Sequence, residues 1–415
     1  MRVKFFTLGC KVNQYETQGL KEQFLHRGHK ITEEKADLYI INTCTVTSRA
    51  DSKSKDTILR AKKENPEAKI AVSGCLAQLN RDFIAELGVD YIISQDQKAF
   101  LPDIILGFPS SKKAFKITRF SNHRAFVKVQ DGCDNSCSFC KIPYLRGSSR
   151  SKTKAAAIAE IKKVCRRHKE IVLCGVNLGL WGRDLTPEST LGSLVKDLLK
   201  VSSLGRLRLS SLEPLFLNQE LFSLLHHEKL CPHFHFPFQY GDDRILAEMN
   251  KKETVNLYQD KVFQIRKIRP EAAISCDIMV GFPTESEESF RNTVNFLTMI
   301  KPMRMHIFTF SPRENTRFSK VKIKDSKIIR QRYNFLRRLS SDFARNYKQK
   351  FLGKILNMVA EEENQGYISG HTENYIRVWI KDKISLGQIV PVAIEAIDGD
   401  KVFVSLARSK RNNAS

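Results

Sequence analysis

The sequence predicts an α/β protein built in three parts: an open parallel α/β sheet, an incomplete (β/α)6 TIM-like barrel and a small OB-like β-barrel. Three observations support this prediction. Short apolar runs alternate with helical segments at the start of the chain. Six strand–helix units follow, and five short strands with turn signals come last. We expect the three domains at residues 1–105, 119–349 and 350–411.

The composition is that of a folded protein with an anionic partner. The chain has 415 residues, 41% hydrophobic and 27% charged, which excludes a disordered or low-complexity protein. Its 69 Lys and Arg exceed its 45 Asp and Glu, giving a net charge of +24, which favours nucleic acid or a membrane surface. No apolar run is long enough to span a membrane and no signal-peptide pattern is present. We therefore expect a cytoplasmic protein that binds nucleic acid and no membrane.

The first part predicts the open sheet. Strands are expected at 3–8, 38–42, 69–73 and 91–94, and helices at 16–27, 50–64 and 81–87. Cys10, Cys44 and Cys75 each fall two residues after a predicted strand. Ligand sites gather at the carboxyl ends of strands in such sheets, so these cysteines could converge although no short motif links them. Each of them taken alone is better explained as a buried core thiol.

The second part predicts the barrel. Strands are expected at 125–130, 171–176, 206–212, 233–239, 273–280 and 303–311, and helices at 154–168, 191–202, 256–268 and 287–300. In 233–239 the three Phe share one face of the strand, whereas both His, Pro237 and Gln239 share the other. This alternation is typical of a barrel with helices outside and a polar lumen.

The last part combines a basic helix with the small barrel. Residues 313–354 contain fourteen Lys or Arg and three acidic residues, and we expect a long helix at 326–349. Strands are expected at 355–361, 366–371, 375–379, 389–397 and 401–406. Five short strands in so short a segment fit an OB-like barrel, a common nucleic-acid-binding module.

The most informative motif is CxxxCxxC, formed by Cys133, Cys137 and Cys140 directly after the first predicted barrel strand. Three thiolates this close can hold three irons of a [4Fe–4S] cluster and leave the fourth iron open. A structural zinc site is the alternative, but it needs a fourth Cys or His nearby and none follows. With Phe139 before the last cysteine, the motif is typical of radical S-adenosylmethionine (SAM) enzymes, in which the open iron binds SAM.

The sequence as a whole resembles the radical SAM methylthiotransferases, most closely the MtaB-type branch that modifies N6-threonylcarbamoyladenosine in tRNA. The resemblance covers essentially the whole chain, and its last motif falls in what looks like the RNA-binding TRAM domain of that family. The segments that carry it are 7–16 (TLGCKVNQYE), 42–47 (NTCTVT), 73–78 (SGCLAQ), the three-cysteine loop, 175–179 (GVNLG), 208–214 (RLSSLEP), 277–283 (DIMVGFP), 311–313 (SPR) and 372–375 (TENY).

The resemblance implies two [4Fe–4S] clusters and SAM as cofactors. Cys133, Cys137 and Cys140 would be the catalytic ligands of the cluster that cleaves SAM. Cys10, Cys44 and Cys75 would hold a second cluster, whose open iron carries the sulfur to be inserted. The implied reaction places a methylthio group on carbon 2 of the adenosine at position 37, beside the anticodon, with SAM as methyl donor and radical source. An electron donor such as flavodoxin or ferredoxin is implied as a further partner.

Five residues are weaker candidates for SAM contacts because they lie at or near predicted strand ends. They are Asn177, Glu213, Gln239, Asp277 and Gly281. Asn177, Glu213 and Gln239 are expected near the amino or ribose groups, and Gly281 in a turn beside the adenine; a hydrogen-bonded barrel residue is an equal alternative for each polar group. We assign no metal to His233 and His235, and a structural role to the remaining cysteines.

Two other interpretations remain open at this stage. The same chemistry could act on isopentenyladenosine in tRNA or on a ribosomal-protein aspartate, since the motifs favour threonylcarbamoyladenosine by resemblance only. The second of these interpretations is an RNA-binding protein with a structural metal and no catalysis. It predicts zinc in place of iron, and no cleavage of SAM.

Overall fold

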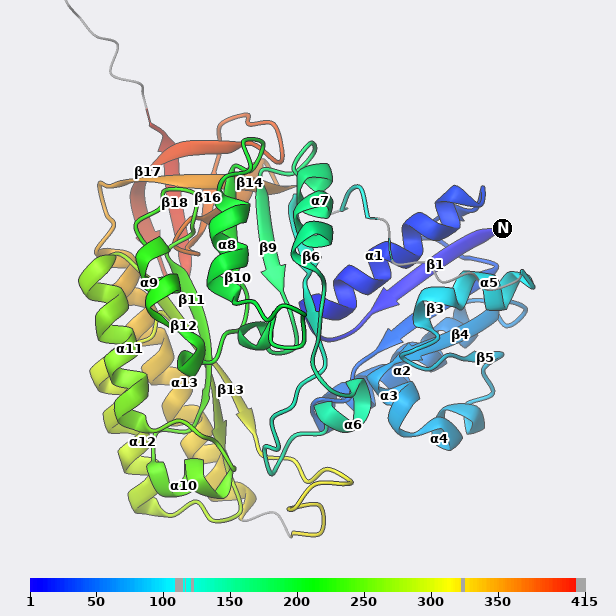
Figure 1. The fold of residues 1–415 in the computed structure, drawn as a ribbon, viewed down its shortest axis with the longest axis horizontal. Coiled ribbons are helices and arrows are strands. Elements are labelled where there is room, and N and C mark those ends of the chain that lie inside the picture. Colours follow the sequence, from blue (N-terminus) through cyan, green and yellow to red (C-terminus); the bar gives the residue numbers. More distant parts are fainter. Residues whose placement is uncertain (109–114, 116, 121–122, 322–324, 408–415) are drawn as a thin grey trace, which may run out of the picture.

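The computed structural model describes residues 1–108, 115, 117–120, 123–321 and 325–407. Three parts lie side by side in Figure 1: an N-terminal sheet domain, a central barrel, and a C-terminal β-barrel at one end of the central one. This is the predicted α/β architecture. The expected end of the third domain, residue 411, lies outside the described residues. None of the described helices is both long and apolar enough to cross a membrane.

The N-terminal domain is a parallel five-stranded sheet in the order β2-β1-β3-β4-β5. Its strands are β1 (Arg2–Thr7), β2 (Lys30–Ile31), β3 (Leu38–Thr43), β4 (Lys69–Gly74) and β5 (Tyr91–Ile92). Its helices are α1 (Lys11–His26), α2 (Ser48–Glu64), α3 (Cys75–Leu79), α4 (Arg81–Glu86) and α5 (Leu101–Leu106). The strand order reverses between β1 and β3, and such a switch point is where open α/β sheets bind ligands.

Alternate residues of β3 face two separate cores. Leu38 and Ile40 pack with α1 and α5, whereas Tyr39 and Ile41 pack with α2, α3 and α4. All six residues of the strand are buried and its first four are apolar, as expected for a central parallel strand that is covered on both faces. Helices therefore cover both faces of the sheet and leave its carboxyl edge for a site.

Two three-stranded parallel sheets make the central barrel, β6-β9-β10 and β11-β12-β13. Parallel bridges between Leu207 and Leu230 and between Ser211 and His235 join them across β10 and β11. The strands are β6 (Arg124–Lys128), β9 (Glu170–Cys174), β10 (Arg206–Leu209), β11 (His233–Gln239), β12 (Ala273–Val280) and β13 (Arg304–Thr309). In the described residues β6 and β13 do not pair with each other, so the barrel is incomplete, as predicted.

Helices surround this barrel on the outside. They are α7 (Lys154–Val164), α8 (Leu191–Leu199), α9 (Gln219–Leu224), α10 (Asp243–Glu248), α11 (Val255–Ile268), α12 (Glu287–Ile300) and α13 (Ser326–Gln349). The predicted alternation in β11 is confirmed: Phe234, Phe236 and Phe238 are buried, and the Phe238 ring contacts Tyr258 of α11 and Phe296 of α12. The other face of β11 is left for the lumen.

Five strands close the C-terminal barrel in the order β14-β15-β16-β18-β17. They are β14 (Ile355–Asn364), β15 (Tyr367–Thr372), β16 (Arg377–Ile380), β17 (Ile389–Asp398) and β18 (Lys401–Leu406). All pairs are antiparallel except β16 with β18. A closed five-stranded barrel of this kind fits the expected OB-like fold.

The C-terminal barrel docks on the amino ends of the central strands through a buried charge cluster. Glu170 of β9 is fully buried and pairs with Arg206 and Arg208 of β10. Burial alone would raise the pKa of Glu170, but the guanidinium groups of Arg206, Arg208 and Arg124 hold it well below its ordinary value. The two β10 arginines donate onward, at 2.7–3.1 Å, to the backbone carbonyls of Asn357, His371, Thr372 and Glu373. One anion therefore anchors two domains together.

Candidate cluster and cofactor site

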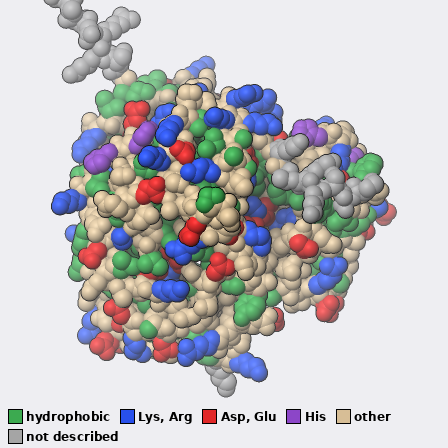
Figure 2. Space-filling view, viewed as in Figure 1, with side chains coloured by type: hydrophobic (Ala, Val, Ile, Leu, Met, Phe, Trp, Pro, Cys, Tyr) green, Lys and Arg blue, Asp and Glu red, His purple; other side chains and the backbone are tan. Residues whose placement is uncertain are grey.

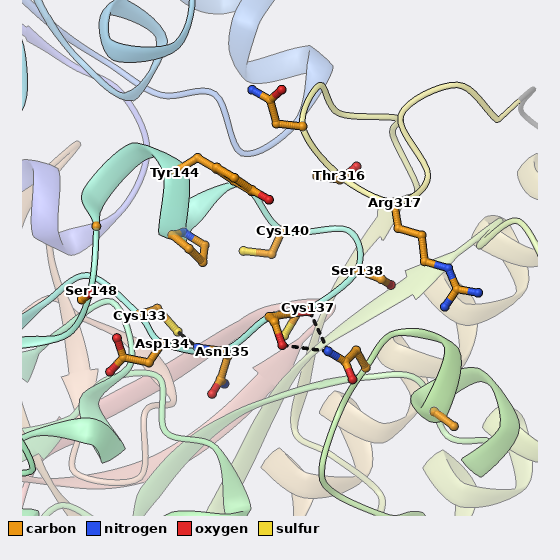
Figure 3. A pocket seen from close by; sticks show the side chains of 16 residues that line it. Cys133, Asp134, Asn135, Cys137, Ser138, Cys140, Tyr144, Ser148, Thr316 and Arg317 are labelled. Carbon is orange, nitrogen blue, oxygen red and sulfur yellow. Dashed lines mark hydrogen bonds between the residues drawn. The ribbon is translucent and has the colours of Figure 1, made fainter.

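The three cysteines of the CxxxCxxC motif lie around one space. Their loop runs from β7 (Gln130–Asp131) to α6 (Ile142–Arg146), and β7 pairs with β8 (Arg150–Ser151). The Cys133 amide donates to the Gly147 carbonyl at 3.0 Å, and the Cys140 amide to the Cys137 carbonyl at 3.1 Å. Figure 3 shows the three side chains at the edge of a cavity of about 780 Å³, which also has Arg317 and Tyr144 in its lining.

Burial disfavours the thiolate form of these cysteines. It raises the pKa of Cys137 to about 12 and that of Cys140 to about 11. Backbone and side-chain N–H groups oppose this at Cys133, whose sulfur accepts from the Asn135 amide at 3.4 Å and the Asn177 side chain at 3.9 Å. Only thiolates bind iron or zinc, so a metal centre here must displace protons when it assembles.

The donor set of the loop fits a [4Fe–4S] cluster better than a structural zinc ion. Structural zinc takes four ligands in tetrahedral geometry, usually Cys or His. The loop supplies three cysteines, and the one group of metal-ligand type found among the described residues, His235, Asp277 and His306, includes none of them. Three thiolates suffice for a [4Fe–4S] cube, which takes one at each of three iron corners.

A second cavity of about 150 Å³ opens behind the same cysteines and contains three of the five predicted SAM contacts, Asn177, Glu213 and Gln239. The buried oxygens Asn177 Oδ1 and Gln239 Oε1 have no hydrogen-bond partner among the residues that the structure describes. Buried acceptors without a partner are costly. Gln239 also adopts a φ of +67°, a strained conformation for a residue with a side chain. This cavity thus provides acceptors for the amino and hydroxyl groups of a ligand such as SAM.

Glu213 is held at the edge of this cavity by three donors. Its carboxylate accepts from Asn135 Nδ2 at 2.9 Å, Asn177 Nδ2 at 3.1 Å and Lys251 Nζ at 2.6 Å. Sequence reasoning missed Asn135 and Lys251. Asn135 could have been noticed because it lies inside the cysteine motif, whereas Lys251 follows α10 in a turn that carries no signal.

Asp277 and Gly281, the other two predicted SAM contacts, do not line these cavities. Asp277 lies three residues before the end of β12 and is hydrogen-bonded to His235 and His306, each at 3.1 Å. Burial would raise the pKa of Asp277, but these two imidazoles hold it well below its ordinary value. The Gly281 amide donates to Glu285 at 3.0 Å, and a β-carbon on Gly281 would meet Ile329 of α13 at 2.8 Å. The positions of both residues are explained by packing.

His235, Asp277 and His306 have ligand-type atoms within 4.8 Å of one another. This group was not predicted, since His306 comes from a third strand, β13. Asp277 already uses one oxygen for each imidazole, and the second nitrogen of His235 bonds to Ser275 at 2.9 Å. These contacts form a self-contained hydrogen-bonded set on the lumen side of β11, β12 and β13.

Cys10, Cys44 and Cys75 converge at the carboxyl edge of the N-terminal sheet, as expected. Cys44 and Cys75 follow β3 and β4 directly, one residue closer than predicted, because each strand runs one residue farther. Gly9 has a φ of +92°, and a β-carbon there would lie 2.8 Å from the Cys44 sulfur. Gly74, before Cys75, has a φ of +101° and would meet a backbone carbonyl at 2.3 Å. Only glycine allows these two approaches.

Hydrogen bonds hold the loops of these three cysteines together. The Asn13 side chain donates to the carbonyls of Leu8 and Thr43 at 2.8 and 3.0 Å, which joins the Cys10 and Cys44 loops. Thr43 Oγ1 donates to the Ser73 carbonyl at 2.7 Å, which joins the third loop. Burial raises the pKa of Cys44 to about 11, and the charges of Cys75 and Cys10 add to this rise. The three thiols are therefore close enough to interact.

A buried ion network connects the two cysteine groups. Arg146, at the end of the helix that follows Cys140, donates to Asn13 at 2.7 Å and to Glu16 at 2.9 Å. Lys98 and Lys128 also donate to Glu16, at 2.7 and 2.8 Å. Burial would raise the pKa of Glu16, but these three cations lower it well below its ordinary value. Glu16 thus ties the first helix of the sheet domain to the cysteine loop of the barrel.

A second link lies on the other side of the junction. Arg313, after β13, pairs with Asp51 of α2 at 2.5 Å, and Ser311 bonds to Ser48. The sheet domain is therefore fixed to the barrel at two places, and α3, which begins at Cys75, packs against α6, which follows Cys140. In Figure 1, α3 and α6 lie next to each other at this junction.

Replacing Arg146 with Met should destabilise the protein strongly. Glu16 and Asp131 would lose a buried partner, and removing one member of a buried ion pair costs about 3–5 kcal/mol. The free energy of unfolding, measured by urea denaturation, should fall by about that amount. Arg166→Met, at an exposed position on the same barrel, is the matched control and should change little. Equal stability of the two variants would contradict a structural role for the network.

Comparison with known proteins identifies the family. Residues 2–94 match the uncharacterized protein family UPF0004, and residues 127–297 match the radical SAM superfamily. A protein of Aquifex aeolicus named threonylcarbamoyladenosine tRNA methylthiotransferase MtaB is 36% identical over 95% of this chain and 100% of its own length. The protein of the same name from Bacillus subtilis is 34% identical over 94% and 93%. The chain belongs to the radical SAM methylthiotransferases, in the MtaB branch.

Methylthiotransferases of this family use SAM and a [4Fe–4S] cluster, and they carry a second cluster. A tRNA-2-methylthio-N6-dimethylallyladenosine synthase from Fervidobacterium nodosum is also similar, at 29% identity over 97% of this chain and 98% of its own. Among solved structures, the radical SAM methyltransferase TsrM from Kitasatospora setae matches with a TM-score of 0.56 and 11% identity, over 77% of each chain. That similarity shows a shared fold alone.

Proposed function

We propose that this methylthiotransferase adds a methylthio group to carbon 2 of N6-threonylcarbamoyladenosine at position 37 of tRNA. The observation that carries the proposal is the meeting of two cysteine triads at one junction, in a chain that matches the MtaB relatives over nearly their full length. When bound, SAM and the clusters supply the radical and the methylthio group. The protein supplies position and shelter from water.

Each triad has a separate task in this proposal. Cys133, Cys137 and Cys140 hold the cluster that binds SAM, and their loop faces the larger cavity. Cys10, Cys44 and Cys75 hold the second cluster at the switch point of the sheet. Three protein ligands leave one iron of each cluster open. The fixed links through Glu16 and Asp51 hold the sheet domain, and with it Cys10, Cys44 and Cys75, against the barrel that carries the other three cysteines.

The side chains behind the cysteine loop orient SAM. Asn177 Oδ1 and Gln239 Oε1 are acceptors without protein partners, so they suit the amino and ribose hydroxyl donors of SAM. Glu213, already held by Lys251, would accept a further bond from the SAM amino group. For Asp277 and Gly281 we propose support of the lumen wall and of α13, with no direct contact to SAM.

Basic surfaces fit the tRNA. A groove of about 680 Å³ on α13 is lined by Arg337, Arg338 and Arg345, with Asp342 as its one acidic residue, and Figure 2 shows Lys and Arg, interspersed with Asp and Glu, over the face in view. Such surfaces bind phosphates without reading sequence. Anticodon-loop bases are already single-stranded, so extruding one costs about a few kcal/mol. The C-terminal barrel, an OB-like module, would add a further RNA contact.

The proposal also covers domain boundaries, an electron donor and a location. We place the domain boundaries at 105, 119 and 350: the first falls in the last turn of α5 (Leu101–Leu106), and the last lies between α13 and β14. A reduced flavodoxin or ferredoxin is our proposal for the electron donor, since a one-electron carrier must reach the SAM-binding cluster. A cytoplasmic location follows from a tRNA substrate.

Nucleoside mass spectrometry tests the function. tRNA from cells that lack the gene should contain N6-threonylcarbamoyladenosine without the methylthio group, and the wild-type gene should restore it. Cys137→Ala should abolish both the modification and SAM cleavage, whereas Cys276→Ala, at a buried thiol inside β12, should leave both intact. Loss of a methylthio group from isopentenyladenosine instead would assign the chain to the other tRNA substrate. No change in any nucleoside would contradict the proposal.

A further inference from the structure

Lys11 is a cation without a partner at the junction of the two cysteine groups. It follows Cys10 directly and begins α1. Its side chain is half-buried, and within the described residues it forms no hydrogen bond and no ion pair. A cation this close to the site is attracted to an anion, and the protein itself supplies none.

Most of the other cations around the junction are neutralised; Lys141, which follows Cys140 and is buried, is like Lys11 in having no ion pair within the described residues. Lys98, Lys128 and Arg146 pair with Glu16. Lys152 pairs with Glu160. Others follow the same rule: Arg206 and Arg208 pair with Glu170, Lys251 with Glu213 and Glu253, and Arg313 with Asp51. Among the described residues, the lysines that directly follow a predicted cluster cysteine, Lys11 after Cys10 and Lys141 after Cys140, are thus both unpaired, and Lys11 is the more exposed of the two.

The position of Lys11 can be inferred from the groups that its charge affects. Burial raises the pKa of Cys174, at the carboxyl end of β9, and lowers that of His233, at the start of β11; at both groups the Lys11 charge acts toward a lower pKa. Burial opposes ionisation of Tyr375 in the C-terminal barrel, but Arg124 and Lys11 lower its pKa, and its ring stacks on His233 at 4.3 Å. These three groups come from different sides of the lumen. The Lys11 ammonium group therefore reaches from the sheet domain toward the barrel interior.

We propose that Lys11 binds the carboxylate of the threonyl group on the substrate adenosine, an inference that rests on the proposed function. The threonylcarbamoyl group ends in a carboxylate that is ionised at neutral pH, and an ammonium–carboxylate hydrogen bond is among the stronger contacts in proteins. An adenosine with an isopentenyl group carries no charge there. Lys11 thus provides a reason for choosing one modified adenosine over another.

The covalent structure of the substrate supports this placement. The threonyl group is attached to N6 through a carbamoyl linker, and carbon 2 lies on the same six-membered ring, so the carboxylate is seven bonds from the reacting carbon and can lie on the same edge of the base. That carbon must meet the cluster proposed on Cys10, Cys44 and Cys75. Lys11 is adjacent to Cys10, and its four-carbon stem can span the short distance between cluster and carboxylate.

Steady-state kinetics of the reconstituted holoenzyme test the proposal. Lys11→Met should lower kcat/KM for tRNA bearing threonylcarbamoyladenosine about ten- to hundredfold, mainly through KM, because the contact forms on binding. Lys11→Arg should retain most of the activity. Lys196→Met, at an exposed lysine of α8 that is also unpaired within the described residues, is the matched control and should behave as wild type. Iron and sulfide content and SAM cleavage without tRNA should stay unchanged in all three variants.

A second substrate separates recognition from a general defect. In tRNA whose threonyl carboxylate has been converted to the methylamide, the wild type should lose about as much activity as Lys11→Met loses on the natural substrate. The variant should lose little more on the amide, since the two changes remove the same contact. The proposal would be overturned if Lys11→Met were less active than the wild type by the same factor on the methylamide tRNA as on the natural tRNA. If the wild type fails on both tRNAs, the proposed function itself is wrong.

Discussion

Cys75→Ala should remove one iron cluster and abolish methylthiolation while SAM cleavage persists. Anaerobically reconstituted protein should retain about four of about eight iron atoms, because each [4Fe–4S] centre depends on its own cysteines. The product should fall at least about a hundredfold, below the detection limit of nucleoside mass spectrometry. 5′-Deoxyadenosine should still form from SAM, since Cys133, Cys137 and Cys140 are intact.

The control for this variant is Cys165→Ala, at the buried end of α7, away from both triads. It should keep full iron, full SAM cleavage and full methylthiolation. The two-site account would be contradicted if Cys75→Ala retained all of its iron. It would equally be contradicted if the variant lost SAM cleavage together with the product, since the two triads would then form one functional unit.

Glu170→Ala should loosen the C-terminal barrel from the rest of the molecule. It would leave Arg206 and Arg208 buried without their counter-ion, which costs about 3–5 kcal/mol. The free energy of unfolding should fall accordingly in urea, and limited proteolysis should release a fragment that begins near β14. Glu362→Ala removes an exposed ion pair with Arg377 instead and should change stability little.

The same residue predicts an acid dependence. The folded pKa of Glu170 lies below its ordinary value of 4.5, so the folded state binds fewer protons than the unfolded state near that pH. Its stabilisation is therefore complete above about pH 4.5 and is lost as the pH falls toward the lower folded value. Glu170→Gln should flatten the stability profile in this acid range. If the free energy of unfolding of Glu170→Gln changed with pH in this range as steeply as that of the wild type, Glu170 would not be the group that holds the C-terminal barrel.

Regular patterns in the sequence predicted much of the fold. The bounds of β11, β12, α12 and α13 agree with the prediction, because strict alternation or a long amphipathic stripe defines each of them. Short elements such as α3 and α6 were not predicted, since a helix of one or two turns has too few residues to show a period. Their positions depend on the loops that carry the cysteines.

The candidate site was predicted in part for similar reasons. The rule that ligands gather at strand ends brought Cys10, Cys44 and Cys75 together correctly. Asp277 shows what the alternation of side chains cannot predict. The alternation indicates which face of β12 the residue lies on, but not how far along the barrel axis it lies from the cavity. Arg146 and Glu16 are 130 positions apart, and a contact between such distant charges leaves no local signal.

The most direct measurement is iron anomalous scattering from crystals of the anaerobically reconstituted protein. The account predicts two iron centres that border the same space. One should lie against Cys10, Cys44 and Cys75, and the other against Cys133, Cys137 and Cys140. A single iron centre, or a second one turned away from the first, would contradict it.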